Sequence, residues 1–186
     1  MKKLTLDELQ RLSPDAYREA EKTPICLLLN DIRSLNNVGS AFRTADAFRL
    51  EKIYLCGITG RPPHRDIHKT ALGATETVDW EYVEDAEACV KKLREDGYEI
   101  AALEQVEKST PLQDFQPNAE KHLVLVVGNE VFGVSQALVD TADYVLEIPQ
   151  FGTKHSLNVS VSLGIAVWDI FSKLNFRSKG WEQSAL

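Results

Sequence analysis

The sequence predicts an α/β domain in which a mainly parallel sheet is flanked by helices. Short, continuous apolar runs of the kind found in buried strands alternate with helix signals along the chain. Polar loops rich in Asn, Gly and Ser follow several of these runs, as expected where parallel strands end at a ligand site. With 186 residues, 44% of them hydrophobic, the chain is long enough to bury one full core.

Residues 1–22 are expected to form a short helical extension. Thr5 and Glu8 have the spacing of a capping box, in which each side chain satisfies a backbone N–H at the start of a helix. Ser13 followed by Pro14 is typical of an N-cap and the first helical position. A second helix is therefore predicted to begin at Pro14.

Strands and helices alternate from residue 23 onward. The run Ile25 to Leu29 (ICLLL) predicts a strand buried on both faces, because it is apolar without alternation. A loop from Asn30 to Val38 follows, and helix signals resume from Gly39 or Ser40 through Phe48. The remaining predictions are a strand at 53–56, a loop at 57–63, a helix at 84–95, a strand at 98–103, an irregular segment at 111–117, and strands at 123–127 and 144–148.

The stretch 148–171 changes character in its middle. Up to His155 it is typical of a loop, with Pro149 and Gly152 among polar residues. From Leu157 to Phe171 it predicts a helix with no wide polar face, which must therefore be covered on several sides. The junction at 156–158 places free backbone N–H groups at a helix start, where a ligand is bound best.

Composition excludes several classes of protein. The three cysteines, Cys26, Cys56 and Cys89, are odd in number and far apart, so neither a disulfide framework nor a CxxC motif is expected. The first residues, MKKLTLDELQRL, lack the continuous apolar core of a signal peptide. No run of about 18 apolar residues is present to span a membrane. We therefore expect a cytoplasmic protein with no membrane partner.

Charge is unevenly distributed along the chain. The net charge of −7 argues against a nucleic-acid footprint over the whole surface. The segment 33–69 nevertheless holds seven basic and three acidic residues, whereas 79–120 holds four basic and twelve acidic residues. A polyanion is therefore expected to bind at the basic end, while the acidic block is interpreted as a solvated face.

Three loops at the predicted strand ends form the candidate site: 30–43, 128–135 and 149–158. The middle loop, GNEVFGVS, has the glycine spacing of a phosphate loop but lacks the Lys-Ser/Thr pair, which excludes a P-loop nucleoside triphosphatase. No G-x-G-x-x-G follows any predicted strand, so a dinucleotide-binding fold and a methyltransferase of the ordinary Rossmann kind are also disfavoured.

The segments NNVGSAFRTADAF, LVLVVGNEVFGVS and IPQFGTKHSLNVSVSLGIA resemble, in order and spacing, the three motifs of the SpoU/TrmH family of SPOUT methyltransferases. KTALGA at 69–74 resembles a fourth, weaker element, although Thr70-Ala71 stands where the family often has a serine. The likeness covers about residues 27–171. It implies a methyltransferase domain at 23–176, between the extension at 1–22 and a C-terminal tail at 177–186.

The resemblance implies a chemistry and an assembly. The family transfers a methyl group from S-adenosylmethionine to a ribose 2′-hydroxyl of tRNA or rRNA, as a homodimer whose C-terminal segment is tied into a trefoil knot. Such knots are rare exceptions to ordinary chain topology. The RNA-binding extra domain of many relatives has no counterpart in this sequence. A non-catalytic RNA-binding protein that retains the knotted fold is the alternative.

The resemblance also implies the site residues. Catalytic positions carried over from the motifs are Asn37, Arg43, Glu130, Ser156 and Asn158. The family binds its cofactor largely through the backbone of the second and third motifs, which implies Gly128, Ile148 and Leu157.

The roles of these residues follow from their chemistry. The family arginine is often given the role of proton acceptor, but a guanidinium stays protonated, so we interpret Arg43 as an electrostatic clamp on the target phosphate and oxygen. The amides and the hydroxyl would hold the ribose and the loop, and Asn158 would also cap the helix that follows it. Glu130 is expected at least to place a negative charge near a helix start.

No metal is expected in the reaction. His64 and His68 stand four residues apart, but Pro62-Pro63 precedes them and no third ligand is evident. We interpret both of them, and His155, as polar loop residues.

Overall fold

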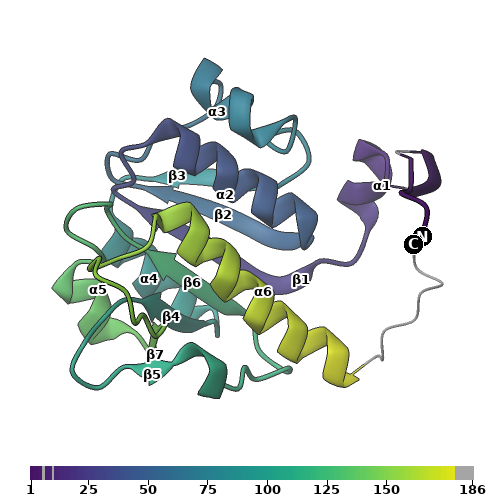
Figure 1. Cartoon of the computed structure of the whole chain (residues 1–186). Helices are drawn as coiled ribbons and strands as arrows, with labels where there is room; N and C mark the ends of the chain where they lie inside the picture. Colours follow the sequence, from purple (N-terminus) through teal and green to yellow (C-terminus); the bar gives the residue numbers. More distant parts are fainter. Residues whose placement is uncertain (6, 10, 179–186) are drawn as a thin grey trace.

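A computed structural model describes residues 1–5, 7–9 and 11–178. These residues form a seven-stranded sheet in the order β3-β2-β1-β6-β4-β7-β5, in which every pairing between named strands is parallel (Figure 1). The strands are β1 (Thr23–Asn30), β2 (Leu50–Cys56), β3 (Trp80–Val83), β4 (Glu99–Leu103), β5 (Thr110–Pro111), β6 (Leu123–Val127) and β7 (Tyr144–Glu147). The predicted α/β class is confirmed.

Helices cover both faces of this sheet, because its central strands are apolar on both sides. The α-helices are α1 (Pro14–Glu19), α2 (Leu35–Ala47), α3 (Arg65–Ala71), α4 (Ala86–Glu95), α5 (Gln136–Thr141) and α6 (Val159–Ser178). In β1, Ile25, Leu27 and Leu29 pack in the layer of α2, α3 and α6, while Cys26 and Leu28 pack in the layer of α4 and α5. Figure 1 shows α2 and α6 crossing one face and α4 lying behind the other.

The strand order creates a switch point between β1 and β6. From β1 the chain moves outward to β2 and β3, whereas from β6 it crosses to β7 on the other side. Loops that leave two neighbouring strands in opposite directions open a crevice at the carboxyl edge of a sheet. The loops after β1 and β6 are two of the three loops that the sequence singles out.

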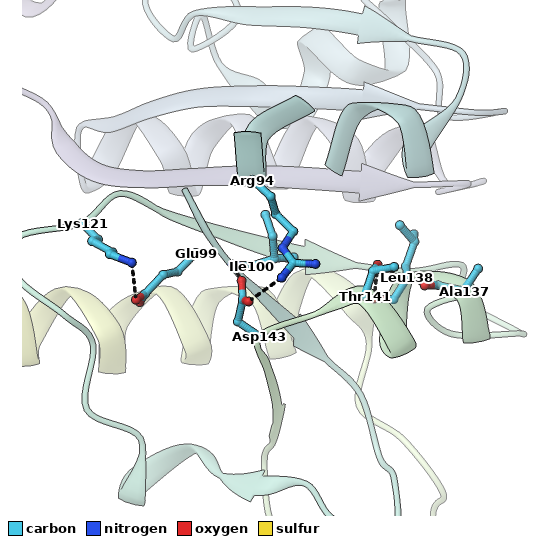
Figure 2. A network of polar contacts seen from close by, with 8 residues as sticks. All are labelled: Arg94, Glu99, Ile100, Lys121, Ala137, Leu138, Thr141 and Asp143. Carbon is cyan, nitrogen blue, oxygen red and sulfur yellow. Dashed lines mark hydrogen bonds and ion pairs between the residues drawn. The ribbon is translucent and has the colours of Figure 1, made fainter. Parts of the chain in front are cut away.

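Asp143, just before β7, connects to helix α4 and strand β4 through its carboxylate (Figure 2). Its carboxylate accepts hydrogen bonds from the Arg94 guanidinium of α4 at 3.1 Å and from the backbone N–H of Ile100 in β4 at 2.9 Å. Lys121 pairs with Glu99 at 3.4 Å beside it. Arg94 and Lys121 therefore both have carboxylate partners.

Three predicted boundaries on the site side were wrong. Helix α2 begins at Leu35 rather than at 39 or 40, because the Ser34 side chain accepts a hydrogen bond from the Asn37 N–H and caps the helix earlier. Helix α6 begins at Val159 rather than at Leu157, because Asn158 caps it by accepting from the Ser160 N–H at 2.9 Å. It also extends to Ser178, past the predicted helix end at Phe171.

Other elements differ by smaller amounts or were not predicted. Strand β2 begins at Leu50, and β7 ends at Glu147. Helix α4 begins at Ala86, because Asp85 caps it, and β4 begins at Glu99. Strand β3 and helix α3 were missed because both are short and lack a continuous apolar run. The segment predicted as irregular holds the end of β5 and the 3₁₀ helix η2 (Leu112–Asp114).

The N-terminal extension is fastened to the domain by Tyr17. Thr5 and Glu8 form the predicted reciprocal capping bonds, although the element that they cap is a 3₁₀ turn, η1 (Asp7–Leu9). Ser13 caps α1 by accepting from the Ala16 N–H, as predicted. Tyr17 is only 5% exposed and its hydroxyl donates to the Ala45 carbonyl of α2. Residues 179–186 of the predicted tail lie outside the described residues.

None of the described helices combines the length and the apolar character that crossing a membrane requires. The three cysteines are free and buried, and all of them lie in the layer of α4 and α5.

Helices α2 and α3 approach each other closely at Gly39. A Cβ atom there would lie 2.1 Å from Thr70 Oγ1 and 2.3 Å from the backbone oxygen of Ile67. The Thr70 hydroxyl donates to the Asn36 carbonyl at 3.0 Å, which ties α3 to the first turns of α2. Only glycine permits this approach.

We therefore expect Gly39→Ala to lower the free energy of unfolding. Alanine in a helix is normally favoured over glycine by about 1 kcal/mol, but overpacking against a backbone oxygen costs about 1–3 kcal/mol. Urea denaturation measures the difference. Ser40→Ala on the same helix is the control, and its stability should change by less than about 0.5 kcal/mol. A Gly39→Ala variant as stable as the parent would contradict the close approach.

Candidate active site

Two of the three predicted strand-end loops, 128–135 and 149–158, border a cavity of about 570 Å³ at the carboxyl edge of the sheet. The ends of β4, β6 and β7 form its floor, and the segment that leads into α6 forms one wall. Apolar side chains of Val127, Leu146 and Ile148 line it beside polar loop groups. Among the described residues it is lined by 103–105, 127–133, 146–148, 150, 155–159 and 162.

Glu130 joins the second motif to the first. Its carboxylate accepts hydrogen bonds from the backbone N–H groups of Arg33 at 2.9 Å and Ser34 at 3.0 Å, and from the Asn37 side-chain amide at 3.0 Å. Burial raises the pKa of Glu130, but these donors lower the pKa, and the net shift is downward. Glu130 is therefore held as a carboxylate.

Asn37 and Asn158 extend this connection to the third motif. The Asn158 side-chain amide donates to the Asn37 side-chain oxygen at 3.3 Å. The Asn158 side-chain oxygen in turn accepts from the backbone N–H and the hydroxyl of Ser160, at 2.9 and 2.6 Å. The prediction that Asn158 caps the helix is confirmed. One chain of hydrogen bonds thus links Glu130, Asn37 and Asn158 across three separate loops.

The second-motif loop folds back on itself at its two glycines. Asn129 and Gly133 exchange backbone hydrogen bonds of 3.0 and 2.8 Å, and Gly133 has a φ of 70°. A Cβ atom on Gly128 would lie 2.1 Å from the Gly133 carbonyl oxygen. Gly128 lines the cavity. Glycine is nevertheless needed at this position because of the backbone contact with Gly133, and not only because a side chain would occupy space for a ligand.

Two residues that hold this loop were not predicted. The Asn129 amide donates to the Asp31 carbonyl at 2.7 Å, and its oxygen accepts from the Val131 N–H at 2.9 Å. The Glu104 carboxylate accepts from the Val134 N–H at 2.8 Å and occupies the space that a side chain at Gly133 would need. Glu104 directly follows strand β4. Its position at a strand end is the feature of the sequence that could have identified it as a site residue.

Most of the predicted site residues meet at the cavity. Those that line it are Gly128, Glu130, Ile148, Ser156, Leu157 and Asn158. Asn37 does not line it, but it bonds to two residues that do.

Arg43 lies elsewhere. It was predicted within the first loop, but it is an exposed residue of α2 and does not line the cavity. It stands four residues after Gly39 and seven after Asn36, on the face of α2 that meets α3. Within the described residues it makes no hydrogen bond or ion pair. The helix therefore presents Asn37 and Arg43 in different directions.

A parallel sheet with helices on both faces and a cavity at the carboxyl ends of its strands defines an α/β protein that binds its ligand at the strand ends. Residues 24–168 match the family described as the SpoU rRNA Methylase family. This match covers most of the chain, and the protein belongs to that family.

Individual relatives are similar over most of this chain. A protein of Staphylococcus aureus (strain MSSA476), described as a TrmH family tRNA/rRNA methyltransferase, is 27% identical over 156 residues, which are 84% of this chain and 62% of the relative. The chain thus spans less than two thirds of the length of the curated relatives it matches.

Two solved structures are similar in fold. The A. aeolicus TrmH/SpoU tRNA modifying enzyme superposes with a TM-score of 0.78 at 26% identity, over 90% of this chain and 84% of that chain. An AdoMet-bound rRNA methyltransferase from Sinorhizobium meliloti gives a TM-score of 0.73 at 26% identity, over 86% of this chain and 60% of that chain.

The lowered pKa of Glu130 predicts a dependence of stability on pH. An unfolded glutamate has a pKa of about 4.3, and the folded value is lower. Glu130 therefore stabilises the fold above the unfolded pKa, and this contribution is lost as the pH falls through the folded pKa. In Glu130→Gln, the free energy of unfolding should fall less than in the parent between about pH 5 and about pH 3.

Urea denaturation at the two pH values measures this effect. Glu130→Gln should also be less stable than the parent at neutral pH, by about 1–3 kcal/mol, because an amide cannot accept from all three donors. The matched control is Glu107→Gln, since the exposed Glu107 carboxylate accepts no hydrogen bond from any described residue. An identical pH dependence in Glu130→Gln and the parent would refute the role given to this carboxylate.

Proposed function

We propose that the protein transfers a methyl group from S-adenosylmethionine to a ribose 2′-hydroxyl of tRNA or rRNA. The observation that carries the proposal is the strand-end cavity joined to the first motif by the chain of hydrogen bonds from Glu130 through Asn37 to Asn158. Membership of the SpoU family and the AdoMet-bound S. meliloti relative support the same chemistry.

The cavity fits the cofactor in size and chemistry. Pockets for small ligands typically hold about 300–1,000 Å³ and combine apolar walls with a few placed polar groups. Gly128, Ile148 and Leu157 would hold the cofactor, with the backbone at the strand ends supplying donors and acceptors. When bound, S-adenosylmethionine supplies the electrophilic methyl group, so the protein needs to position the substrates and favour loss of the hydroxyl proton.

Each predicted catalytic residue has a place in this scheme. Glu130, Asn37 and Asn158 fix the loops around the cofactor. Ser156 is exposed at the cavity and is placed to hydrogen-bond the ribose. Arg43 approaches the RNA from the α3 side of α2 and stabilises charge on the phosphate and on the attacking oxygen.

The alternative is a non-catalytic RNA-binding protein with the same fold. Cofactor titration by calorimetry separates the two functions, because a methyltransferase binds S-adenosylmethionine stoichiometrically. Absence of binding by both the cofactor and its demethylated product at millimolar concentration would exclude the enzyme.

The same proposal extends to the organisation of the protein. Residues 23–176 form the methyltransferase domain, with its C-terminal segment in a trefoil knot, and residues 1–22 are an accessory extension. The cytoplasm is the compartment that suits an RNA substrate and three free cysteines.

Arg43 should be needed for turnover and dispensable for cofactor binding, since it lies outside the cavity. Removing a charge that stabilises a developing oxyanion typically costs about a hundredfold or more in rate. Arg43→Ala should therefore lose about that much methyl transfer and keep its affinity for S-adenosylmethionine. Arg43→Lys should also be poorly active, because lysine lacks the planar fork.

Methyl transfer to RNA and calorimetry with the cofactor measure the two effects separately. Lys91→Ala on the exposed side of α4 is the control and should keep full activity. Full activity of Arg43→Ala on its RNA would overturn the role given to Arg43 in methyl transfer. Lost affinity for S-adenosylmethionine in this variant would show that Arg43 acts on the cofactor and not on the RNA.

A homodimer would cover the outer face of α6. Val161, Ile165 and Trp168 are 50%, 41% and 50% exposed and have the spacing of a single helix face. The Trp168 ring lies 5.9 Å from that of Phe48, which continues the apolar surface onto the end of α2. Such an exposed apolar stripe is typical of an isologous contact between two copies.

Ile165→Glu should convert the protein to a monomer, because it would place two charges in the shared apolar contact. Light scattering should give the chain mass of 20.8 kDa for this variant and twice that mass for the parent. Ile58→Glu, at a 68% exposed position of another surface, should remain a dimer. A parent of monomer mass at micromolar concentration would rule the dimer out.

A further inference from the structure

The cations of α3 and of the loop before it have no carboxylate partners within the part of the chain that the structure describes. Arg61, Arg65 and Lys69 are exposed, and none of them forms an ion pair with a described residue. The chain carries 28 acidic and 21 basic side chains, so partners are not scarce. Lys52, Arg94, Lys121 and Lys173 are all paired. Lys91 and Lys92 of α4 also form no ion pair with a described residue, so the absence of a partner is not enough by itself. Arg61, Arg65 and Lys69 are distinguished because they share one short segment with a single acidic residue, which indicates a surface whose partner is an external anion.

Part of this surface is held in place before any partner binds. The Arg61 guanidinium lies over the Tyr82 ring at 4.5 Å from its centroid. The Tyr82 hydroxyl donates to the Gly57 carbonyl at 2.9 Å, which fixes the ring. His64 caps α3 by accepting from the Asp66 N–H at 3.2 Å. Asp66, the only acidic residue of 61–69, stands in the first turn of α3, where the helix dipole favours it.

The surface is also fixed relative to the candidate active site. Thr70 of α3 bonds to Asn36, the neighbour of Asn37, and α3 packs against α2 at Gly39. The loop before α3 packs on the first turn of α2, since a Cβ atom on Gly60 would lie 2.2 Å from the Leu35 side chain. A polyanion bound along α3 would therefore lie at a set position from the residues around the cavity.

We infer that Arg61, Arg65 and Lys69 bind the phosphate backbone of the RNA next to the nucleotide that is methylated. The inference rests on the proposed function for the identity of the polyanion. Guanidinium and ammonium groups on a surface contact phosphates regardless of base, so these residues position RNA and do not read its sequence. They give this chain an RNA contact within the domain itself.

The test is the salt dependence of RNA binding by Arg65→Gln/Lys69→Gln. The matched control is Lys91→Gln/Lys92→Gln, which removes two exposed cations from α4 in the other layer. Unfractionated bacterial tRNA is the probe, because backbone contacts do not depend on sequence. The α3 variant should bind about tenfold or more weakly, and its slope of log affinity against log salt should be shallower by about 1–2.

Calorimetry with S-adenosylmethionine separates this inference from the proposed function. The α3 variant should bind the cofactor as the parent does, and the α4 variant should match the parent in both assays. If the parent binds tRNA but no cofactor, and the α3 variant loses tRNA, the surface stands and the methyltransferase proposal fails. Equal tRNA affinity and slope in the α3 variant and the parent would overturn the inference.

Discussion

The geometry of the site depends on the Glu130 carboxylate, because a half-buried charge must be surrounded by donors. Its donors come from a segment up to 97 residues earlier in the chain. Since the Asn37 amide nitrogen is used by Glu130, its oxygen is left to accept from Asn158. The Asn158 oxygen is then directed at Ser160, where it caps α6. One acidic side chain thus sets the orientation of two amides and the start of a helix.

The sequence predicts the centre of this fold better than its edges. Strands β1 and β6 are unbroken apolar runs because both of their faces are buried, and this leaves a pattern that needs no tertiary information. Strand β3 holds only four residues, and its burial is partial. Helix α3 depends on the contact between Gly39 and Thr70, which joins residues 31 positions apart and has no local signature.

For the site, the motifs predict which residues meet but not how they are directed. Glu130, Ser156 and Asn158 lie at the cavity because they occupy loops at strand ends, a position that sequence order indicates. Arg43 was placed with them because it follows the same loop, yet the Ser34 cap starts the helix early enough to direct it away. Glu104 was not predicted because a single glutamate after a strand belongs to no recognised motif.

The division of the core into two layers separates what the molecule does from what merely supports it. The layer of α2, α3 and α6 holds Asn37, Arg43 and the apolar stripe of α6, whereas the cysteines and the Arg94–Asp143 ion pair belong to the layer of α4 and α5. An engineer who wants to attach a dye, an affinity handle or a surface tether has a natural place for it. The exposed side of α4 belongs to the opposite layer from α2, α3 and α6, across the sheet.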